Sequence, residues 1–234
     1  MTPSSDKLIA DLFGNGEARP VAASTAERVA DMLRGYLTEG RIAPGTRMSE
    51  EAFAKALSVS RNTLRESFRL LGHEGLLVHE LNRGVFVREF THADVDEIYD
   101  LRELVELAAV RDVAHHTPEG LAALRQCLLE GAQAAAREDW QAVGTLNLEF
   151  HRLLCALSGS ERINKLMRGV LAESRLAFRV MTDVEAMDSP YLTQNEAICD
   201  HLDAGRTEDA AELLAGYLQF ARNQLHSALD ETAQ

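Results

Sequence analysis

Apolar residues recur every three or four positions along most of this chain, which is the period of an amphipathic helix. The first such segment covers residues 24–39, and either Ser24 or Thr25 can cap its start. A second segment covers residues 50–57. A third begins at Arg61, after a Ser-Val-Ser turn whose last serine is a good N-cap. The pattern therefore predicts one helix, followed by two shorter helices joined by a tight turn.

The third segment has an apolar back and a cationic front. Leu64, Phe68 and Leu71 lie three and four residues apart and therefore share one helix face. Arg65 points largely away from them, and Arg61 lies at the exposed start. In a helix-turn-helix the second helix enters the major groove of DNA, and its first residues meet the base edges. Because a guanidinium group can bond O6 and N7 of guanine together, or a phosphate, this pattern indicates a DNA-reading helix rather than ordinary surface charges.

Two short runs of β-forming residues follow, at residues 76–78 and 85–87. Between them, Asn82-Arg83-Gly84 is a turn signal that carries a charge at its tip. The sequence therefore predicts a hairpin, or wing, whose Arg83 is within reach of a phosphate or of the neighbouring minor groove.

The rest of the chain is expected to be helical. Thr91 can cap a new helix with Asp94 three residues later, which is similar to a capping box. Six amphipathic helices without a strand signal predict an antiparallel bundle. The expected helices cover residues 95–115, 118–138, 140–158, 162–181, 190–204 and 207–229, with breaks at 159–160, 188–190 and 204–206. In the first of these helices the apolar repeat that is expected to face the interior is Ile98, Leu101, Leu104, Val105, Ala108 and Ala109.

These elements divide the chain into three parts. We expect a mobile tail with a short helix at residues 1–23, a winged helix-turn-helix at residues 24–90 and an all-helical domain at residues 91–234. The expected fold class is therefore mainly α. With 234 residues, of which 46% are apolar, the chain can form two modest cores.

Composition excludes several classes of protein. No apolar stretch approaches the roughly 20 residues that a membrane span needs, and the N-terminal segment lacks the apolar core of a signal peptide. Cys127, Cys155 and Cys199 are odd in number and widely spaced, so they indicate neither a disulfide framework nor a zinc knuckle. Buried thiols in the reducing cytoplasm are the expectation.

The net charge of −13 is unusual for a DNA-binding protein, but its distribution removes the contradiction. Residues 21–90 contain ten Lys and Arg against nine Asp and Glu, whereas residues 91–234 contain twelve against twenty-five. The acidic residues therefore lie mostly outside the expected DNA-binding domain, and phosphate attraction depends on the local field. Because a nearly neutral domain has modest non-specific affinity, we expect a dimer that doubles the contacts.

Four segments of the first half resemble the winged helix of GntR-family transcription regulators. They read LTEGRIAPGTR at 37–47, SRNTLRE at 60–66, EGLL at 74–77 and NRGVFV at 82–87, in the order and spacing of the family. One departure is Glu51, where some members carry an arginine. Because a carboxylate repels phosphates, we expect no DNA contact from Glu51. The DNA contacts that the resemblance implies are Ser60, Arg61, Asn62, Thr63 and Arg65 on the helix, and Arg83 and Gly84 on the wing.

Three segments of the second half resemble the effector-binding FCD domain of the FadR subfamily: residues 100–106, 147–154 and 195–218. Many FCD domains hold a divalent metal with one Asp and three His. The corresponding positions here are Asn147, His151, Asn195 and Tyr217, so one of the four ligands is kept. An amide is a weak neutral ligand, and a phenol with a pKa of about 10 suits zinc poorly. We therefore expect no metal cofactor, with zinc or a similar ion as the alternative.

The resemblance also implies a ligand of another kind. Arg102 lies in the family's Leu-Arg-x-x-x-Glu pattern, where the arginine can face the cavity. Amides, an imidazole and a guanidinium can bind a carboxylate or a hydroxy acid directly. The expected effector site comprises Arg102, Asn147, His151, Asn195 and Tyr217.

Simpler roles stay open for all five residues. The four bundle positions can be hydrogen-bonded core side chains, and Arg102 can pair with Glu106 on its own helix. His115, His116 and His201 are expected at the surface.

The leading hypothesis is a dimeric transcription regulator, expected to be a repressor, that binds double-stranded operator DNA and a small carboxylate effector. Effector binding would shift the spacing of the two winged helices.

An enzyme is disfavoured, because the sequence lacks paired Glu-x-x-His motifs, a nucleotide-binding loop and a nucleophile elbow. A third hypothesis is an architectural DNA-binding protein that senses nothing. A collapsed, empty bundle core would favour this third class, and a polar cavity would favour the sensor.

Overall fold

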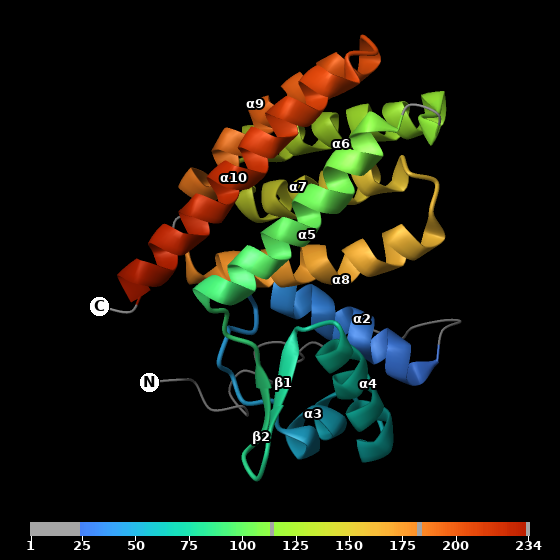
Figure 1. Cartoon of the computed structure of the whole chain (residues 1–234). Coiled ribbons are helices and arrows are strands. Elements are labelled where there is room, and N and C mark those ends of the chain that lie inside the picture. The colour runs from blue at the N-terminus through green and yellow to red at the C-terminus, as the bar shows by residue number, and fades with distance from the viewer. Residues whose placement is uncertain (1–23, 113–114, 182–183, 233–234) are drawn as a thin grey trace. The chain divides into compact units, whose positions relative to one another are not determined.

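The computed structural model describes residues 24–112, 115–181 and 184–232, which form two compact units (Figure 1). The first unit is Met1–Glu89 and the second is Phe90–Gln234. The tail and short helix expected at residues 1–23 lie outside the described residues. The predicted mainly-α class is confirmed, because the described chain forms one small hairpin and is otherwise helices with their connections.

The described part of the first unit has the element order of a winged helix-turn-helix. Helix α4 packs against both α2 and α3, and the hairpin follows it directly. The elements are α2 (Thr25–Thr38), α3 (Glu50–Ala56), α4 (Arg61–His73), β1 (Leu77–Glu80) and β2 (Gly84–Val87).

A serine side chain caps the start of each of these helices. Ser24 accepts a hydrogen bond from the amide of Glu27, whose carboxylate accepts one from the amide of Ser24. Ser49 and Ser60 cap α3 and α4 by accepting from the amide three residues later. Because a capping oxygen satisfies an amide that has no partner inside the helix, these serines fix where the helices begin.

The apolar faces predicted for the three helices meet in one core. Leu33 of α2, Phe53 of α3 and Leu64 and Leu71 of α4 are all fully buried. The rings of Phe53 and Phe68 lie edge to face, with centroids 6.3 Å apart. This packing holds α4 in place and leaves its opposite face to solvent.

The hairpin closes through a three-residue loop. Leu77 pairs with Val87 and Glu80 pairs with Gly84, so the ladder extends beyond the apolar run that predicts it. Backbone pairing, rather than apolarity, sets the end of this strand. In the loop Asn82 has a φ of 62°, a left-handed conformation that asparagine tolerates better than most residues.

The described part of the second unit is the predicted helical bundle, and α7 is its central helix (Figure 1). Helix α7 packs against α5, α6, α8 and α9, and α10 packs against α5 and α9. Within the described segments, none of the helices has the length and apolar character that a membrane crossing requires. The elements are α5 (His92–Arg111), α6 (Pro118–Ala136), α7 (Trp140–Ala156), α8 (Glu161–Ala177), the 3-10 helix η2 (Phe178–Val180), α9 (Val184–Asp203) and α10 (Thr207–Thr232).

Helix α5 begins with the predicted capping box of Thr91 and Asp94, but it buries a different face from the one expected. The apolar repeat predicts Leu104 in the interior, whereas this side chain is 72% exposed. Arg102 and Glu106 are buried instead. Because these two opposite charges pair with each other one helical turn apart, the bundle can accept a polar face of α5.

The predicted break at residues 188–190 is wrong, because α9 begins at Val184 and continues through Pro190. A proline inside a helix removes a backbone donor and usually ends the helix. Here Asp188 and Tyr191 are buried on either side of the proline, and Asp188 pairs with Arg175 of α8. These tertiary contacts outweigh the local preference and hold the first turns of α9 on the bundle.

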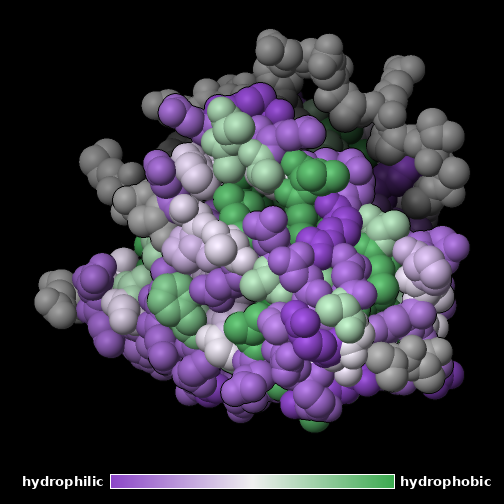
Figure 2. Space-filling view, turned by 90° about the horizontal axis from the view of Figure 1, so that it is seen from above, coloured by the Kyte–Doolittle hydropathy of each residue, from purple (hydrophilic) through white to green (hydrophobic). Residues whose placement is uncertain are grey.

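The surface view in Figure 2 shows apolar residues in small groups between polar ones. In the second unit several large apolar side chains are nevertheless exposed on the outside of the bundle, and such side chains are available for contact with another protein. They are Leu104, Leu129, Leu166, Leu213 and Phe220.

We predict that Leu33→Ala lowers the unfolding free energy of the first unit by about 2–5 kcal/mol, because it leaves a cavity beside α4. The measurement is hydrogen exchange of α2 and α4 amides in the full chain. Leu81→Ala is the control, since this leucine is 83% exposed in the wing loop and its loss should change little. Equal protection in both variants would contradict the assigned core.

Candidate DNA interface and effector site

Helix α4 presents two arginines to solvent from its first two turns. The side chains of Arg61 and Arg65 are each 61% exposed, while Leu64 beside them is fully buried. Asn62 is also exposed. The structure therefore places these three predicted DNA-contact residues on an accessible face.

Ser60 and Thr63 have a structural role at the start of α4. The Ser60 hydroxyl accepts from the amide of Thr63, and the two hydroxyl oxygens lie 2.8 Å apart. Ser60 is exposed and Thr63 is half-buried. The N-terminus of a helix attracts anions through its free amides and its dipole, so this cap lies where a phosphate can bind.

The exposed arginines of α4 and of the wing loop are each paired with a glutamate. Exposed ion pairs stabilise a fold by about 1 kcal/mol or less. A DNA phosphate or base can therefore replace the glutamate as the partner of the arginine, or bind the arginine beside it. Glu51, the departure noted in the sequence, is one of the four partners. The pairs are Arg61–Glu51 at 3.3 Å, Arg65–Glu50 at 2.6 Å, Arg69–Glu66 at 2.5 Å, and Arg83–Glu80.

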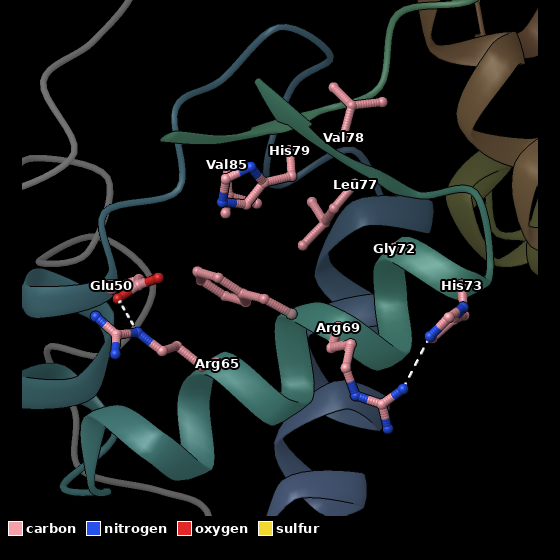
Figure 3. A pocket seen from close by; sticks show the side chains of 10 residues that line it. Glu50, Arg65, Arg69, Gly72, His73, Leu77, Val78, His79 and Val85 are labelled. Carbon is pink, nitrogen blue, oxygen red and sulfur yellow. Dashed lines mark hydrogen bonds and ion pairs between the residues drawn. The ribbon is translucent and has the colours of Figure 1, made fainter. Parts of the chain in front are cut away.

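A groove of about 640 Å³ runs between α4 and the hairpin (Figure 3). Its floor is apolar, and cationic or titratable side chains from α4 and β1 stand around it. Figure 3 shows Arg65 directed toward Glu50 on one side and Arg69 directed toward His73 on the other. The lining residues are Glu50, Arg65, Phe68, Arg69, Gly72, His73, Leu77, Val78, His79 and Val85.

The wing carries Arg83 at its tip, where the side chain is 71% exposed. Its guanidinium carbon lies 5.5 Å from the centre of the Phe86 ring. Gly84 has a φ of 114°, and a Cβ at this position would lie 3.5 Å from Nε of Arg47. The backbone conformation therefore favours glycine, whereas Arg47 lies only at ordinary contact distance.

In the second unit, the five residues expected to bind an effector lie in one polar cluster, in which Asn147 is half-buried and the other four are buried. Arg102 donates from Nε to Oε1 of Glu106 at 2.8 Å, and its Nη1 donates to the Ser174 hydroxyl at 3.1 Å. The other oxygen of Glu106 lies 2.6 Å from Nδ1 of His151. All four side chains are at most 3% exposed. The pairing of Arg102 with Glu106, left open in the sequence, is thus present.

The remaining three residues form a second chain of hydrogen bonds. Nδ2 of Asn195 donates to Oδ1 of Asn147 at 2.7 Å, and the hydroxyl of Tyr217 lies within 3.0 Å of the same amide group. The rings of His151 and Tyr217 stack edge to face at 4.7 Å and connect the two chains. Helices α5, α7, α9 and α10 therefore contribute to one cluster.

A second arginine, which the sequence did not single out, completes the cluster. Arg175 of α8 is buried, and its Nη1 lies 3.3 Å from both carboxylate oxygens of Asp188. Its guanidinium passes over the backbone of α7 at Gly144, where a Cβ would lie 2.0 Å from Nη2. Any side chain larger than that of glycine would displace the guanidinium from this position. A glycine inside an apolar helix and an arginine on an apolar face were the available signals.

Several polar atoms of the cluster have no hydrogen-bond partner among the described residues. They include Nη2 of Arg102, Nε and Nη2 of Arg175, Nε2 of His151 and Oδ1 of Asn195. A buried polar atom without a partner costs about 1–3 kcal/mol, so such atoms are usually satisfied by water or by a ligand. The cluster therefore has unused donors and acceptors in the interior.

Burial and the neighbouring charges set the protonation states. Burial alone would raise the pKa of Glu106, but Arg102 and His151 outweigh it and lower the pKa of this carboxyl group. Burial lowers the pKa of His151, so its imidazole is neutral near pH 7. Because Nδ1 faces the ionised Glu106, it carries the proton, and Nε2 is left as an acceptor.

Burial also raises the pKa of Asp188, although Arg175 opposes this shift. It raises the pKa of Tyr217 well above its usual value. Tyr217 therefore keeps its proton near pH 7 and is not an anionic ligand.

The cluster does not fit a divalent metal. Its donor set is one imidazole, two amides that bond to each other, and a protonated phenol. Across residues 24–112, 115–181 and 184–232, no three His, Cys, Asp or Glu side chains lie close enough to hold an ion.

The cluster surrounds two small cavities of about 10 Å³ each, which is space for one water molecule. One is lined by Arg102, His151 and Arg175, among others, and the second by Asn147 and Asn195. Polar side chains reach both cavities, although most of the lining is apolar, and a metabolite requires the surrounding helices to separate.

The other predictions for this unit concern single side chains. Cys127, Cys155 and Cys199 are buried free thiols, as expected. His115 is exposed, whereas His116 and His201 are half-buried.

Comparison with known proteins places both units in families. Residues 25–87 match the family described as bacterial regulatory proteins of the gntR family, and residues 97–220 match the FCD domain. A crystal structure described as a putative GntR transcriptional regulator from Rhodococcus sp. RHA1 is 44% identical, covers 88% of this chain and 99% of its own, and has a TM-score of 0.82.

Two curated relatives give the same assignment. An uncharacterised HTH-type transcriptional regulator of Bacillus subtilis is 33% identical over 60% of this chain, and the match spans only 63% of that relative's length. A protein of Paenarthrobacter nicotinovorans, named as a probable D-xylose utilisation operon repressor, is 28% identical over 86% of this chain and 88% of its own. The chain therefore belongs to the GntR family of bacterial regulatory proteins and carries an FCD domain.

Proposed function

We propose that this protein is a transcription regulator whose winged helix binds operator DNA and whose FCD domain binds a small hydroxycarboxylate without a metal. The observation that carries the effector part is the set of buried, unpartnered donors and acceptors between Arg102, Arg175 and His151. Relatives named as operon repressors support repression as the regulatory outcome.

The DNA-binding part rests on the exposed cationic face of α4. Arg61 and Arg65 project from the first turns of a helix whose other face is locked into the core, as base reading in the major groove requires. Asn62 and the caps at Ser60 and Thr63 add polar groups beside them, and Arg83 with Gly84 supplies a wing contact.

The chemistry of the effector follows from which atoms are unused. Nη2 of Arg102 and two nitrogens of Arg175 are donors, and a carboxylate supplies matching acceptors. Nε2 of His151 and Oδ1 of Asn195 are acceptors, so they call for a ligand donor such as a hydroxyl group. A carboxylate that carries a hydroxyl group, held near Asn147 and Tyr217, satisfies both sets.

Entry of this ligand requires the contact between Arg175 and Asp188 to give way, because the cavities are too small as they stand. Both bonds of this pair are long, at 3.3 Å. We propose that the ligand carboxylate replaces Asp188 on Arg175 and thereby releases the first turns of α9.

A non-sensing architectural protein is the second candidate function. The small cavity volumes favour this candidate, whereas the unpartnered charged groups favour the sensor.

A homodimer completes the proposal. The winged helix is nearly neutral in charge, so doubled contacts strengthen its DNA binding. Exposed apolar side chains such as Leu104 and Phe220 on the bundle supply surface for a second copy.

We predict that Arg65→Ala weakens operator binding by roughly 1–3 kcal/mol per half-site, because it removes a base-reading guanidinium from the major groove. Gel shifts measure this on a duplex selected from a random pool by the unaltered protein. Arg69→Ala is the matched control, since Glu66 already engages two nitrogens of that arginine. Circular dichroism verifies folding, and an unchanged shift with Arg65→Ala would count against the interface.

We predict that small hydroxycarboxylates such as glycolate and lactate raise the Tm of the protein in the presence of a chelator. Ligands that bind only the folded state stabilise it by mass action, and this site needs no metal. Thermal melts with and without added zinc are the measurement. A carboxylate effect that depends strictly on zinc would overturn the metal-free site.

We predict that Asp188→Asn lowers stability, by about 3–5 kcal/mol, because it leaves the buried Arg175 without its counter-charge. The same change should enlarge the Tm increase given by glycolate, since the competing carboxylate is gone. Asp200→Asn is the control, because this aspartate is 62% exposed and pairs at the surface with Arg125. An identical glycolate effect in both variants would show that Asp188 does not compete with the ligand.

A further inference from the structure

Glu50 lies in a position to determine how Arg65 reads DNA. It is the first residue of α3, whose N-cap is Ser49, so its backbone is fixed next to α4. Its Oε2 accepts from Nε of Arg65 at 2.6 Å, as the dashed line in Figure 3 shows. Its side chain is 31% exposed, half as much as that of Arg65.

The contact uses only the inner nitrogen of the guanidinium. Among the hydrogen bonds of the described chain, Arg65 takes part through Nε alone, so Nη1 and Nη2 stay at the outer end of the side chain. Two such nitrogens can bond O6 and N7 of one guanine together. The hydrogen bond from Nε to the carboxylate therefore restricts rotation of the guanidinium group and leaves Nη1 and Nη2 available to a base.

Arg69, one turn further along α4, is held differently. Its Nε and Nη2 both donate to Glu66, at 2.9 and 2.5 Å, and its Nη1 lies 2.8 Å from Nε2 of His73. All three nitrogens of its guanidinium are thus engaged. The two neighbouring arginines differ in what they can still offer to a base, although both are exposed and both are ion-paired.

We propose that Glu50 is a positioning residue that sets the specificity of Arg65 for one guanine of the operator. A carboxylate this close to DNA also repels phosphates, so it lowers affinity for every sequence. In return for this loss of general affinity, ordering a long, flexible arginine side chain before binding favours the correct base. This inference rests on the proposed DNA-binding function.

Two variants separate positioning from charge. Glu50→Ala and Glu50→Gln remove the same negative charge, but the amide oxygen of glutamine can still accept from Nε of Arg65. If charge alone matters, both variants bind all DNA more tightly and to the same extent. If the position of the Arg65 side chain matters, the alanine variant loses specificity for the selected duplex. The glutamine variant then shows a specificity between those of the alanine variant and the unaltered protein.

The experiment measures affinity for two duplexes, one selected from a random pool by the unaltered full-length protein and one unrelated. We expect Glu50→Ala to bind the unrelated duplex more tightly and the selected duplex less tightly, so that the ratio of the two affinities falls by roughly ten- to hundredfold. A second selection with this variant should lose the preference for a single G·C pair per half-site. Glu66→Ala, on the same face, should strengthen both affinities and leave the ratio unchanged.

Equal ratios for the alanine and glutamine variants would overturn the positioning role, and so would a preserved preference at every base pair. If the unaltered protein enriches no sequence at all, the proposed DNA-binding function fails, and this inference fails with it. A protein that selects a sequence, and whose Glu50→Ala variant selects the same one, refutes the inference alone.

Discussion

The burial of two arginine–carboxylate pairs is the constraint on which the helical bundle depends. Removing a charge from water is costly, and the cost is offset only when an opposite charge and further hydrogen bonds are supplied. Arg102 has Glu106 and Ser174, whereas Arg175 has two long contacts to Asp188. The bundle is built around these pairs: α5 turns a polar face inward, α7 carries a glycine beneath a guanidinium, and α9 continues through a proline.

The same pairing has a different consequence at the surface of the first unit. There the arginines of α4 are paired with glutamates in water, where an ion pair is weak and easily exchanged. Such pairs lower the local positive field, so they reduce affinity for arbitrary DNA without removing the donors that a specific site can use. The contrast between Arg65, which is bonded through one nitrogen, and Arg69, which is engaged through all three, shows that geometry rather than charge distinguishes these sites.

Sequence periodicity was sufficient where one face of an element is apolar. The recognition helix, its serine cap and the wing follow from patterns of local contacts, and the structure has each of them within a residue or two. The expectations for Leu104 and Pro190 failed because a distant partner decides those positions. The spacing allowed Arg102 to pair with Glu106, but the burial of this pair depends on Ser174 of α8 and His151 of α7. Likewise, no local pattern shows that Asp188 holds α9 through Arg175 on another helix.

The unpartnered atoms of the cluster have no partner among the described side chains, so water in the small cavities or a ligand must satisfy them. Each unsatisfied buried donor or acceptor costs about 1–3 kcal/mol, and several of them surround cavities that hold at most one water each. In the proposed sensor, a ligand would hydrogen-bond these atoms only when the helices have separated enough to admit it. Its binding would therefore shift the population toward the opened bundle. In the proposed sensor, these unpartnered atoms would supply the difference in affinity between the closed and the opened bundle that regulation requires.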